Sequence, residues 1–547
     1  MAEGAVIENL STRKLLYILL LLALAQIAFF AIGALVAPVP SSSMEFEMVK
    51  CSDKTRGTAG HWFHVRPPKC DVIEDLSTYQ PSSFDLREIV FIAQMPHARG
   101  GLQLEYSPWF QFLLGLMHVE VGYSDNFKYV PGSKLMLEVR MGVRTHASAP
   151  DAWEEYVDSN VTRTLDCTID DSKRSEGNTY QCETLDLFEL GSNNYPFYLL
   201  NVRIPIDREG CMRDPIGTPN CQIGMVKELH VVAIHQNGGF TLVWLWLKTL
   251  LCPVVVAALY WFHRRLSSLP RQRLLLEKAI LALGAALVVL DAPLEWLSLF
   301  ARLPCLLLLS DLRQGLFYLV LFSFWLIFAG EHLIDDPHLN DLTAYRKNLA
   351  LVGVASLSLL VYDMAERGTQ LADPFCSIWS TERGTTLAYV TIYVALACTL
   401  AYFAFLFYKI MVVWNTIRRK RAAHIYRTSE NRRLKVEGVI YRFKFLMLFT
   451  LVCSALTIAA YFMRQFGEAS LHGESTDESI LTHSTSAFFT GTFGMWNIYV
   501  LLLIAMYAPS HKQYQGAQGL IDENEDLMDG ERTESNPLTT FLKPATD

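Results

Sequence analysis

Long apolar runs alternate with polar segments along the 547 residues of this chain. A helix of about 20 apolar residues crosses the hydrocarbon layer of a membrane, so runs of this length predict spanning helices. We place eight of them at Leu15–Val36, Val243–His263, Ala279–Phe300, Gly315–Phe328, Ala350–Tyr362, Leu387–Trp414, Phe443–Phe462 and Ala487–Ala508. The fourth and fifth runs are short, and they span only if their polar flanks lie near the membrane surface.

The first apolar run admits two interpretations. Arg13 and Lys14 precede it, as basic residues precede the apolar core of a signal peptide. Such a core has about 7–15 residues, whereas the run from Leu15 to Val36 is longer, which favours an uncleaved anchor helix. The alternative is a signal cleaved near Ala34–Ala37, which would leave seven spans.

Basic residues near the span ends predict the orientation, because loops rich in Lys and Arg stay in the cytosol. Arg13 and Lys14 place the N-terminus there, and alternation then places the basic loops at 264–278 and 418–442 on the same side. The segment between the first two spans falls in the lumen. The expected domains are a cytosolic N-terminus (1–14), a first helix (15–37), a lumenal β-rich domain (38–240), a seven-helix bundle (241–510) and a cytosolic tail, low in apolar residues and expected to be disordered (511–547).

The predicted lumenal segment has the pattern of a β-domain. Between Leu137 and Arg144, apolar and other residues alternate, which in a strand directs one face to a core and one to water. Further strands are expected at Glu120–Tyr123, Tyr198–Ile206 and Leu229–His235. The fold class is therefore an α-helical polytopic membrane protein with an inserted antiparallel β-sandwich.

Six of the 11 cysteines lie in this segment, namely Cys51, Cys70, Cys167, Cys182, Cys211 and Cys221. An even set in a lumenal domain predicts three disulfides. Six cysteines allow fifteen pairings, and proximity in sequence favours joining each to its neighbour in that order. Cysteine and histidine spacings typical of a zinc site do not occur, so no metal is expected. The sequon at Asn160 would be glycosylated if it is exposed.

Polar residues gather at span ends on the predicted lumenal side: Asp291, Glu295, Asp311, Arg313, Gln314, Asp363, Glu366 and Arg367. Ionisable groups near a membrane are costly unless they are paired or hydrated, so they mark a site or a structural pair. One interpretation is the hydrated mouth of a cavity between helices. The other is a set of ion pairs that hold helices together, with Arg313 or Arg367 bound to a nearby carboxylate.

Composition and motifs narrow the possible functions. Only 19% of residues are charged and the net charge is -8, which does not indicate a nucleic-acid-binding face. The nucleophile elbow, zinc-protease, Walker and dinucleotide motifs do not occur, so an enzyme is not expected and neither is a cofactor. Two alternatives remain open. A seven-helix signalling receptor would suit the basic loop but lacks the Glu/Asp-Arg-Tyr signature, and a transporter would be expected to show inverted repeats.

Ten stretches, in order along the chain, resemble the Wntless family: Ser107–Phe112 (SPWFQF), Ala233–Thr241 (AIHQNGGFT), Asp311–Gly315 (DLRQG), Gly330–His332, Glu366–Gly368, Pro374–Trp379 (PFCSIW), Arg442–Leu448, Ser486–Gly491, Gly494–Asn497 and Tyr507–Lys512. The resemblance implies eight spans, cytosolic termini, a lumenal β-sandwich and a receptor-like bundle. It also implies a cargo receptor that binds lipid-modified Wnt, carries it to the cell surface and recycles through a clathrin adaptor and retromer. The implied locations are the endoplasmic reticulum, Golgi, endosomes and plasma membrane.

A lipid carrier needs an apolar slot, since a 16-carbon acyl chain in water costs on the order of 10 kcal/mol at about 0.8 kcal/mol for each CH₂. We expect the slot among spans four to eight, with candidate wall residues Phe317, Tyr318, Phe375, Trp379, Phe488, Phe489 and Trp496. The cytosolic signals differ from the family pattern. Val436–Val439 stands where relatives resemble one another in Tyr-Glu-Gly-Leu, and the C-terminus lacks the vertebrate-type retrieval ending. The acidic run with Glu523, Leu527 and Met528 resembles an acidic dileucine signal.

Overall fold

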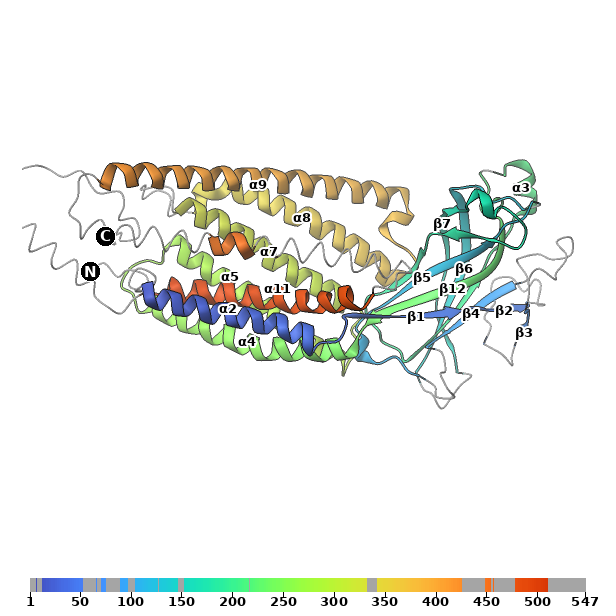
Figure 1. Ribbon diagram of the computed structural model, residues 1–547, viewed down its shortest axis with the longest axis horizontal. Coiled ribbons are helices and arrows are strands. Elements are labelled where there is room, and N and C mark those ends of the chain that lie inside the picture. The colour runs from blue at the N-terminus through green and yellow to red at the C-terminus, as the bar shows by residue number, and fades with distance from the viewer. Residues whose placement is uncertain are drawn as a thin grey trace, which may run out of the picture.

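In the computed structural model, a β-sandwich stands at one end of a bundle of long helices (Figure 1). The structure describes residues 6, 12–52, 65, 70–74, 89–96, 104–125, 127–145, 152–215, 217–331, 342–425, 448–453, 456 and 478–509.

Two six-stranded antiparallel sheets form the sandwich. The first has the order β1-β12-β5-β9-β8, with β10 also paired to β5. Its strands are β1 (Ser41–Glu47), β12 (Met225–Gln236), β5 (Leu113–Gly122), β9 (Thr179–Cys182), β8 (Cys167–Thr168) and β10 (Leu185–Leu190). The second sheet has the order β3 (Asp71–Val72), β2 (Val49–Ser52), β4 (Ile89–Met95), β11 (Phe197–Arg203), β6 (Ser133–Arg144) and β7 (Glu154–Leu165).

The alternating apolar residues of the predicted strands form the core of the sandwich. In β6, Leu137, Val139 and Met141 are at most 1% exposed and belong to one apolar cluster with Leu229 and Val231 of β12. Residues two apart in a strand share a face, so each sheet directs one face into this cluster. The expected strands at Leu137–Arg144 and Leu229–His235 are confirmed within β6 and β12. The other two overlap β5 and β11 but extend too far, since β5 ends at Gly122 and β11 at Arg203.

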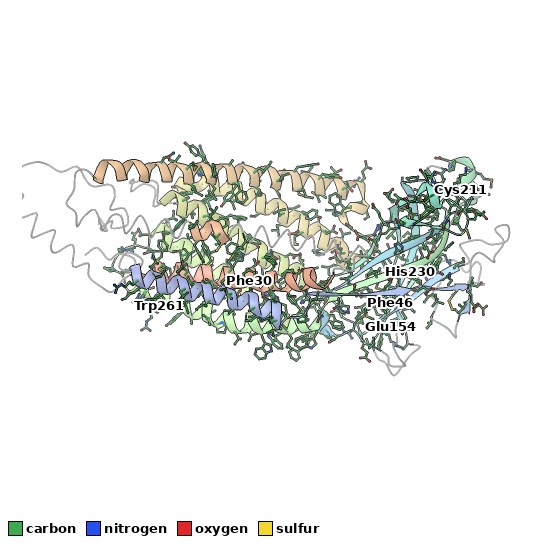
Figure 2. The ribbon with its side chains drawn as sticks, viewed as in Figure 1. Phe30, Phe46, Glu154, Cys211, His230 and Trp261 are labelled. Atoms are coloured by element: carbon green, nitrogen blue, oxygen red, sulfur yellow. A yellow bond between two sulfur atoms is a disulfide. The ribbon has the colours of Figure 1, made fainter. Side chains whose placement is uncertain are left out.

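Three disulfides join Cys51 to Cys70, Cys167 to Cys182 and Cys211 to Cys221, so pairing by proximity is confirmed. Each such bond stabilises a domain by about 2–4 kcal/mol, largely by restricting the unfolded chain. The third bond ties Cys211, within α3 (Arg208–Arg213), to the loop that follows this helix, at the end of the sandwich far from the bundle (Figure 2).

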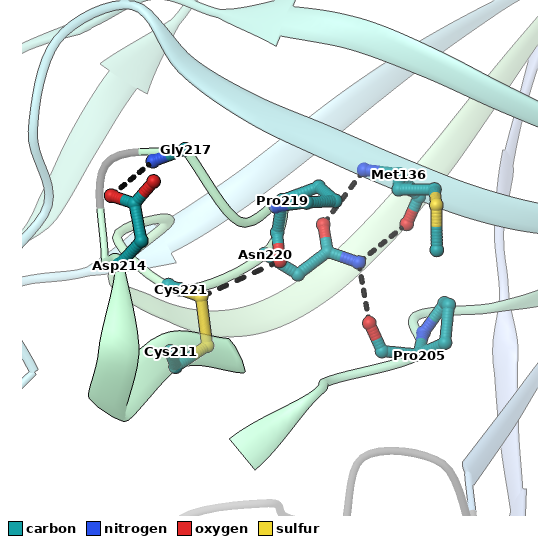
Figure 3. Close-up of a disulfide and its surroundings, with 8 residues drawn as sticks. All are labelled: Met136, Pro205, Cys211, Asp214, Gly217, Pro219, Asn220 and Cys221. Atoms are coloured by element: carbon teal, nitrogen blue, oxygen red, sulfur yellow. Dashed lines mark hydrogen bonds between the residues drawn. A yellow bond between two sulfur atoms is a disulfide. The ribbon is translucent and has the colours of Figure 1, made fainter. Parts of the chain in front are cut away.

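Asn220, beside that disulfide, fastens the α3 loop to the second sheet (Figure 3). Its Nδ2 donates to the carbonyls of Met136 and Pro205, both at 2.7 Å, and its Oδ1 accepts from the Met136 N–H at 2.7 Å. Its φ of 65° lies in the left-handed region, which asparagine tolerates better than most residues.

We therefore expect Asn220→Ala to lower the free energy of unfolding of the sandwich by about 2–4 kcal/mol, because buried backbone groups lose their partner and the backbone is strained. Asn220→Gly should cost less, since glycine accepts this φ. Thermal melting of the purified chain measures both. The matched control is Asn178→Ala, whose hydrogen bonds to Lys173 and Ser175 are exposed. Equal melting temperatures for Asn220→Ala and this control would refute the anchoring role.

The long helices of the bundle are α2 (Thr12–Leu35), α4 (Gly238–Ser267), α5 (Leu275–Asp291), α7 (Leu306–Glu331), α8 (Leu342–Ala372), α9 (Glu382–Ile425) and α11 (Glu478–Met506). Among the described residues, six of these helices are long and apolar enough to cross a membrane. The remaining one, α5, has 17 residues and is not among the six. The fourth and fifth apolar runs are parts of helices of 26 and 31 residues. The seventh run is described only at 448–453 and 456, which are helical.

The third predicted span, Ala279–Phe300, is wrong at its C-terminal end. The helix α5 stops at Asp291, and a separate turn, α6 (Glu295–Ser298), follows. Pro293 explains the break, because proline lacks a donor N–H and disfavours the helical conformation in the residue before it.

The first helix, α2, packs along the last, α11 (Figure 1). A Cβ at Gly33 would lie 2.5 Å from Ala487 Cα, and one at Gly491 would lie 2.5 Å from the Phe30 ring, so the close approach at these two positions requires glycine. Gln26 donates to the Gly491 carbonyl at 2.9 Å. Small residues and interhelical hydrogen bonds are the usual basis of helix packing in membranes.

Candidate functional site at the junction of sandwich and bundle

One side of the sandwich is fastened to α4 and α6 by the turn at Pro108–Phe110. The Trp109 ring meets the Trp296 ring with centroids 5.9 Å apart. Thr241 Oγ1, in the first turn of α4, donates to the Trp109 carbonyl at 2.7 Å, and Gln111 Nε2 donates to Ser298 Oγ at 3.3 Å. Because β12 leads directly into α4, these contacts fix the orientation of α4 relative to the sandwich.

His235, near the end of β12, packs into this turn. Its ring stacks on Phe110, with centroids 4.3 Å apart, and lies edge-on to Tyr106 at 5.7 Å. Burial lowers the pKa of His235 below its usual value, so the imidazole is neutral against these rings at neutral pH.

On the other side, Arg367 joins the sandwich to two helices. From α8, its Nη1 donates to Glu189 Oε1 of β10 at 2.6 Å and its Nε to Asp311 Oδ2 of α7 at 3.2 Å. Gln370 Nε2 donates to Glu189 Oε2 at 2.7 Å, so both oxygens of this carboxylate are held. A hydrogen-bonded network of this kind fixes geometry more firmly than a single exposed ion pair.

The loop between α8 and α9 adds to this attachment. Arg163 Nη2 of β7 donates to the Phe375 carbonyl at 2.8 Å, and the Phe375 ring packs on Phe188 of β10 with centroids 5.9 Å apart. Glu366 accepts from Ser377 Oγ at 3.0 Å and from the Ile378 N–H at 2.8 Å, which closes the loop back onto α8.

On the bundle side of the junction, a charged cluster is buried among α4, α6 and α7. Glu295 Oε1 lies 2.5 Å from Lys248 Nζ and 2.8 Å from Arg313 Nη2, so one carboxylate serves two cations. Arg313 Nη1 also donates at 2.6 Å to the carbonyl of Ala292, which the break after α5 makes available. At the end of α5, Asp291 accepts from Asn497 of α11 at 3.4 Å. The buried charges of Glu295, Lys248 and Arg313 are tolerated because they are paired with one another.

An aromatic layer follows one to three turns further along α7. The rings of Phe317 and Trp496 meet at 5.7 Å, and Tyr318 stacks on Phe322 at 6.1 Å. Gly315 lies near Tyr318 on the helix surface, since residues three apart are neighbours. Gly315 is exposed on the surface of α7, and a Cβ placed there would meet no heavy atom within 4 Å.

The structure divides the predicted polar residues into these two groups. Asp291, Glu295 and Arg313 are in the buried cluster, while Asp311, Glu366 and Arg367 are in the junction. Gln314 is exposed, and Asp363 lies half-buried on α8 one turn before Arg367. For Arg313 and Arg367, the arrangement is that of the second interpretation, ion pairs that hold elements together.

Of the predicted wall residues, Phe317, Tyr318 and Trp496 gather in the bundle. Phe375 belongs instead to the core of the sandwich, where it is 1% exposed. It is therefore not part of a wall between helices, because the α8–α9 loop carries it away from the bundle.

Three further wall residues lie on other surfaces. Phe488 packs on Phe30 of α2, and Phe489 packs on Phe240 of α4, each pair with centroids 6.0 Å apart. Trp379 is 42% exposed and contacts Tyr389 of α9. None of these three contacts involves α7.

Sequence reasoning missed Lys248, Glu189 and Gln370. Lys248 could have been found, because it is the only charged residue within the apolar run Val243–His263. No local signal marks Glu189 or Gln370. Asn160 is exposed on β7, as a glycosylated asparagine must be. The predicted sorting residues Glu523, Leu527 and Met528, like Val436–Val439, lie outside the described residues.

The fold and the junction define a membrane protein in which a disulfide-bonded β-sandwich is fixed to a bundle of apolar helices. The family model of the Wntless GOLD domain matches residues 49–236, and that of the Wntless-like transmembrane domain matches 237–511. The chain is 62% identical to a Caenorhabditis elegans protein wntless homolog over all of both chains. It is 39% identical to the human protein wntless homolog, covering 93% of this chain and 92% of that one. It is 42% identical to the Drosophila virilis protein wntless, covering 94% and 91%.

The chain belongs to the Wntless family. Family membership implies a role in Wnt secretion, as a transport protein rather than an enzyme.

Proposed function

We propose that this chain is a cargo receptor that binds acylated Wnt in the secretory pathway and carries it to the cell surface. It then returns by endocytosis and retrieval to the Golgi, through a clathrin adaptor and retromer. In this proposal the sandwich and the junction face the lumen, and both termini are cytosolic. Family membership supports the role, and the junction supports the mechanism, because it holds a soluble domain directly over the helices.

The physical task of such a carrier is to hide an acyl chain. A 16-carbon chain in water costs on the order of 10 kcal/mol, which would hold a secreted protein in the bilayer or aggregate it. A carrier must therefore offer apolar surface next to a domain that binds the polypeptide.

We place the acyl chain beside the face of α7 that carries Gly315 and Tyr318. The exposed Gly315 supports this placement, because a position without a side chain would let an acyl chain lie directly against the backbone of α7. The Asp311–Arg367 ion pair lies one turn closer to the sandwich, so this part of α7 begins next to the junction. Tyr318 and Phe322 supply apolar ring surface further along the same face. The polypeptide of the cargo would then lie against the sandwich.

The decisive test is co-purification of the full chain with Wnt, comparing acylated Wnt with a variant that cannot be acylated. We expect at least a tenfold loss of bound Wnt without the acyl group, because most of the binding energy comes from burying it. Both forms of Wnt should first be shown to fold, by equal protease resistance. Equal recovery of the two folded forms would refute the proposal that the lipid is what the carrier binds.

A further inference from the structure

Four potential metal ligands form a square on the outer face of the first sheet. In the antiparallel pairing of β5 with β12, Glu120 lies opposite Glu228, and His118 lies opposite His230. Within each strand the two residues are two apart, so all four side chains leave the same face. All four are half-buried, and Figure 2 shows His230 in the sandwich, away from the helices.

Without a bound metal ion, this pairing of strands is unfavourable. Like charges directly opposite one another in neighbouring strands destabilise the pair, and here two carboxylates face each other. Further carboxylates surround them, because Glu47 is opposite His230 in β1 and Glu45 is two residues before it. One cation, Lys50, binds Glu228 at 3.2 Å. A divalent cation between the strands would remove the repulsion that remains.

The distances suit one ion. Ligand atoms of Glu120, Glu228 and His230 lie within 4.8 Å of one another, and His230 Nε2 is 3.6 Å from Glu228 Oε2. Ligand atoms at about 2.0–2.1 Å from a tetrahedral zinc ion are roughly 3.4 Å apart. Small side-chain rotations would therefore bring all three ligand atoms within bonding distance of one zinc ion. The His118 ring, whose centroid is 6.3 Å from that of His230, is near enough to supply the fourth.

Neighbouring residues already orient these ligands. Glu45 Oε1 lies 3.4 Å from His230 Nδ1, which favours a proton on Nδ1 and leaves Nε2 free to bind a metal. Lys50 contacts Oε1 of Glu228 and leaves Oε2, the oxygen nearer His230, available. A carboxylate behind a ligating histidine is the common second shell of zinc sites.

We infer that Glu120, Glu228 and His230, with His118, bind one divalent transition-metal ion, and that zinc is the ion that fits best. Mixed imidazole and carboxylate ligands favour zinc over magnesium or calcium, which prefer oxygen ligands alone. The ion would tie β5 to β12, the strand that continues into α4, and so would stabilise the sheet that carries the junction.

The test is a metal titration of the full chain, purified in detergent and stripped with a chelator. Cobalt(II) is the spectroscopic probe, and zinc is then measured by competition with a chromogenic chelator. We expect one equivalent of cobalt with the visible absorption of a four-coordinate site, displaced by zinc. Replacement of a ligand, by His230→Ala or Glu120→Gln, should weaken zinc binding at least 100-fold. Glu45→Gln should weaken it about 10–100-fold, as outer-shell changes do.

Matched controls separate this site from other surface histidines and carboxylates. His263→Ala removes an exposed histidine of α4, and Glu138→Gln removes a carboxylate of the second sheet. Both should bind zinc like the original chain. Zinc should also raise the melting temperature of the original chain but not of Glu120→Gln. Without metal, Glu120→Gln should melt no lower than the original, because it removes a repulsion.

Several outcomes would overturn the inference. They are no zinc binding by the original chain, undiminished binding by both His230→Ala and Glu120→Gln, or equal weakening by the controls. A metal-free Glu120→Gln chain that melts below the metal-free original would also overturn it, since the opposed carboxylates would then be stabilising without an ion.

Discussion

Replacing Glu295 by glutamine is expected to lower the melting temperature of the purified protein by roughly 5–10 °C. Glu295 is the shared partner of Lys248 and Arg313, which are each 4% exposed. Removing one member of a buried charged group leaves the others unpaired and costs about 3–5 kcal/mol. Thermal unfolding in detergent, followed by tryptophan fluorescence, measures the change.

Two companion variants make this test specific. Lys248→Met should destabilise less, because Glu295 keeps Arg313 as its partner. Glu382→Gln, at the exposed start of α9, should melt like the original protein. If Glu295→Gln melts at the original temperature, the buried cluster does not hold α4, α6 and α7 together as the geometry indicates.

Filling the space beside α7 with Gly315→Trp is expected to lower the recovery of acylated Wnt at least tenfold while leaving the melting temperature unchanged. The side chain would enter space where a Cβ meets no atom within 4 Å. Replacing an interior helical glycine also does not weaken the helix, since glycine is among the poorest helix formers. Co-purification with acylated Wnt measures the effect, and melting shows that the variant folds.

Leu316→Trp is the matched control, since it adds the same side chain at the next position of α7, where Leu316 is 41% exposed. It should bind acylated Wnt like the original protein. A folded Gly315→Trp protein that recovers as much Wnt as this control would show that the acyl chain lies elsewhere. That result would not refute the cargo function, which is tested separately by comparing acylated with non-acylated Wnt.

The metal-ligand square shows why local sequence patterns missed a candidate site. The segments His118–Glu120 and Glu228–His230 are more than 100 residues apart, and neither has a metal-binding spacing by itself. Only the register of β5 against β12 places them opposite one another. The same holds for the Arg367–Glu189 contact, which joins α8 to β10.

The apolar helices, the alternating strands and the pairing of neighbouring cysteines could all be predicted from the amino-acid sequence, because each depends on hydrophobic periodicity or on residues close in the chain. The break after Asp291 depends equally on a local residue, Pro293, although hydropathy alone concealed it. Only the fold shows which polar residues meet, that Phe375 lies in the sandwich rather than in the bundle, and that Gly315 is exposed beside the junction. These depend on how distant elements pack, and packing is set by the shapes of many side chains together rather than by any local pattern.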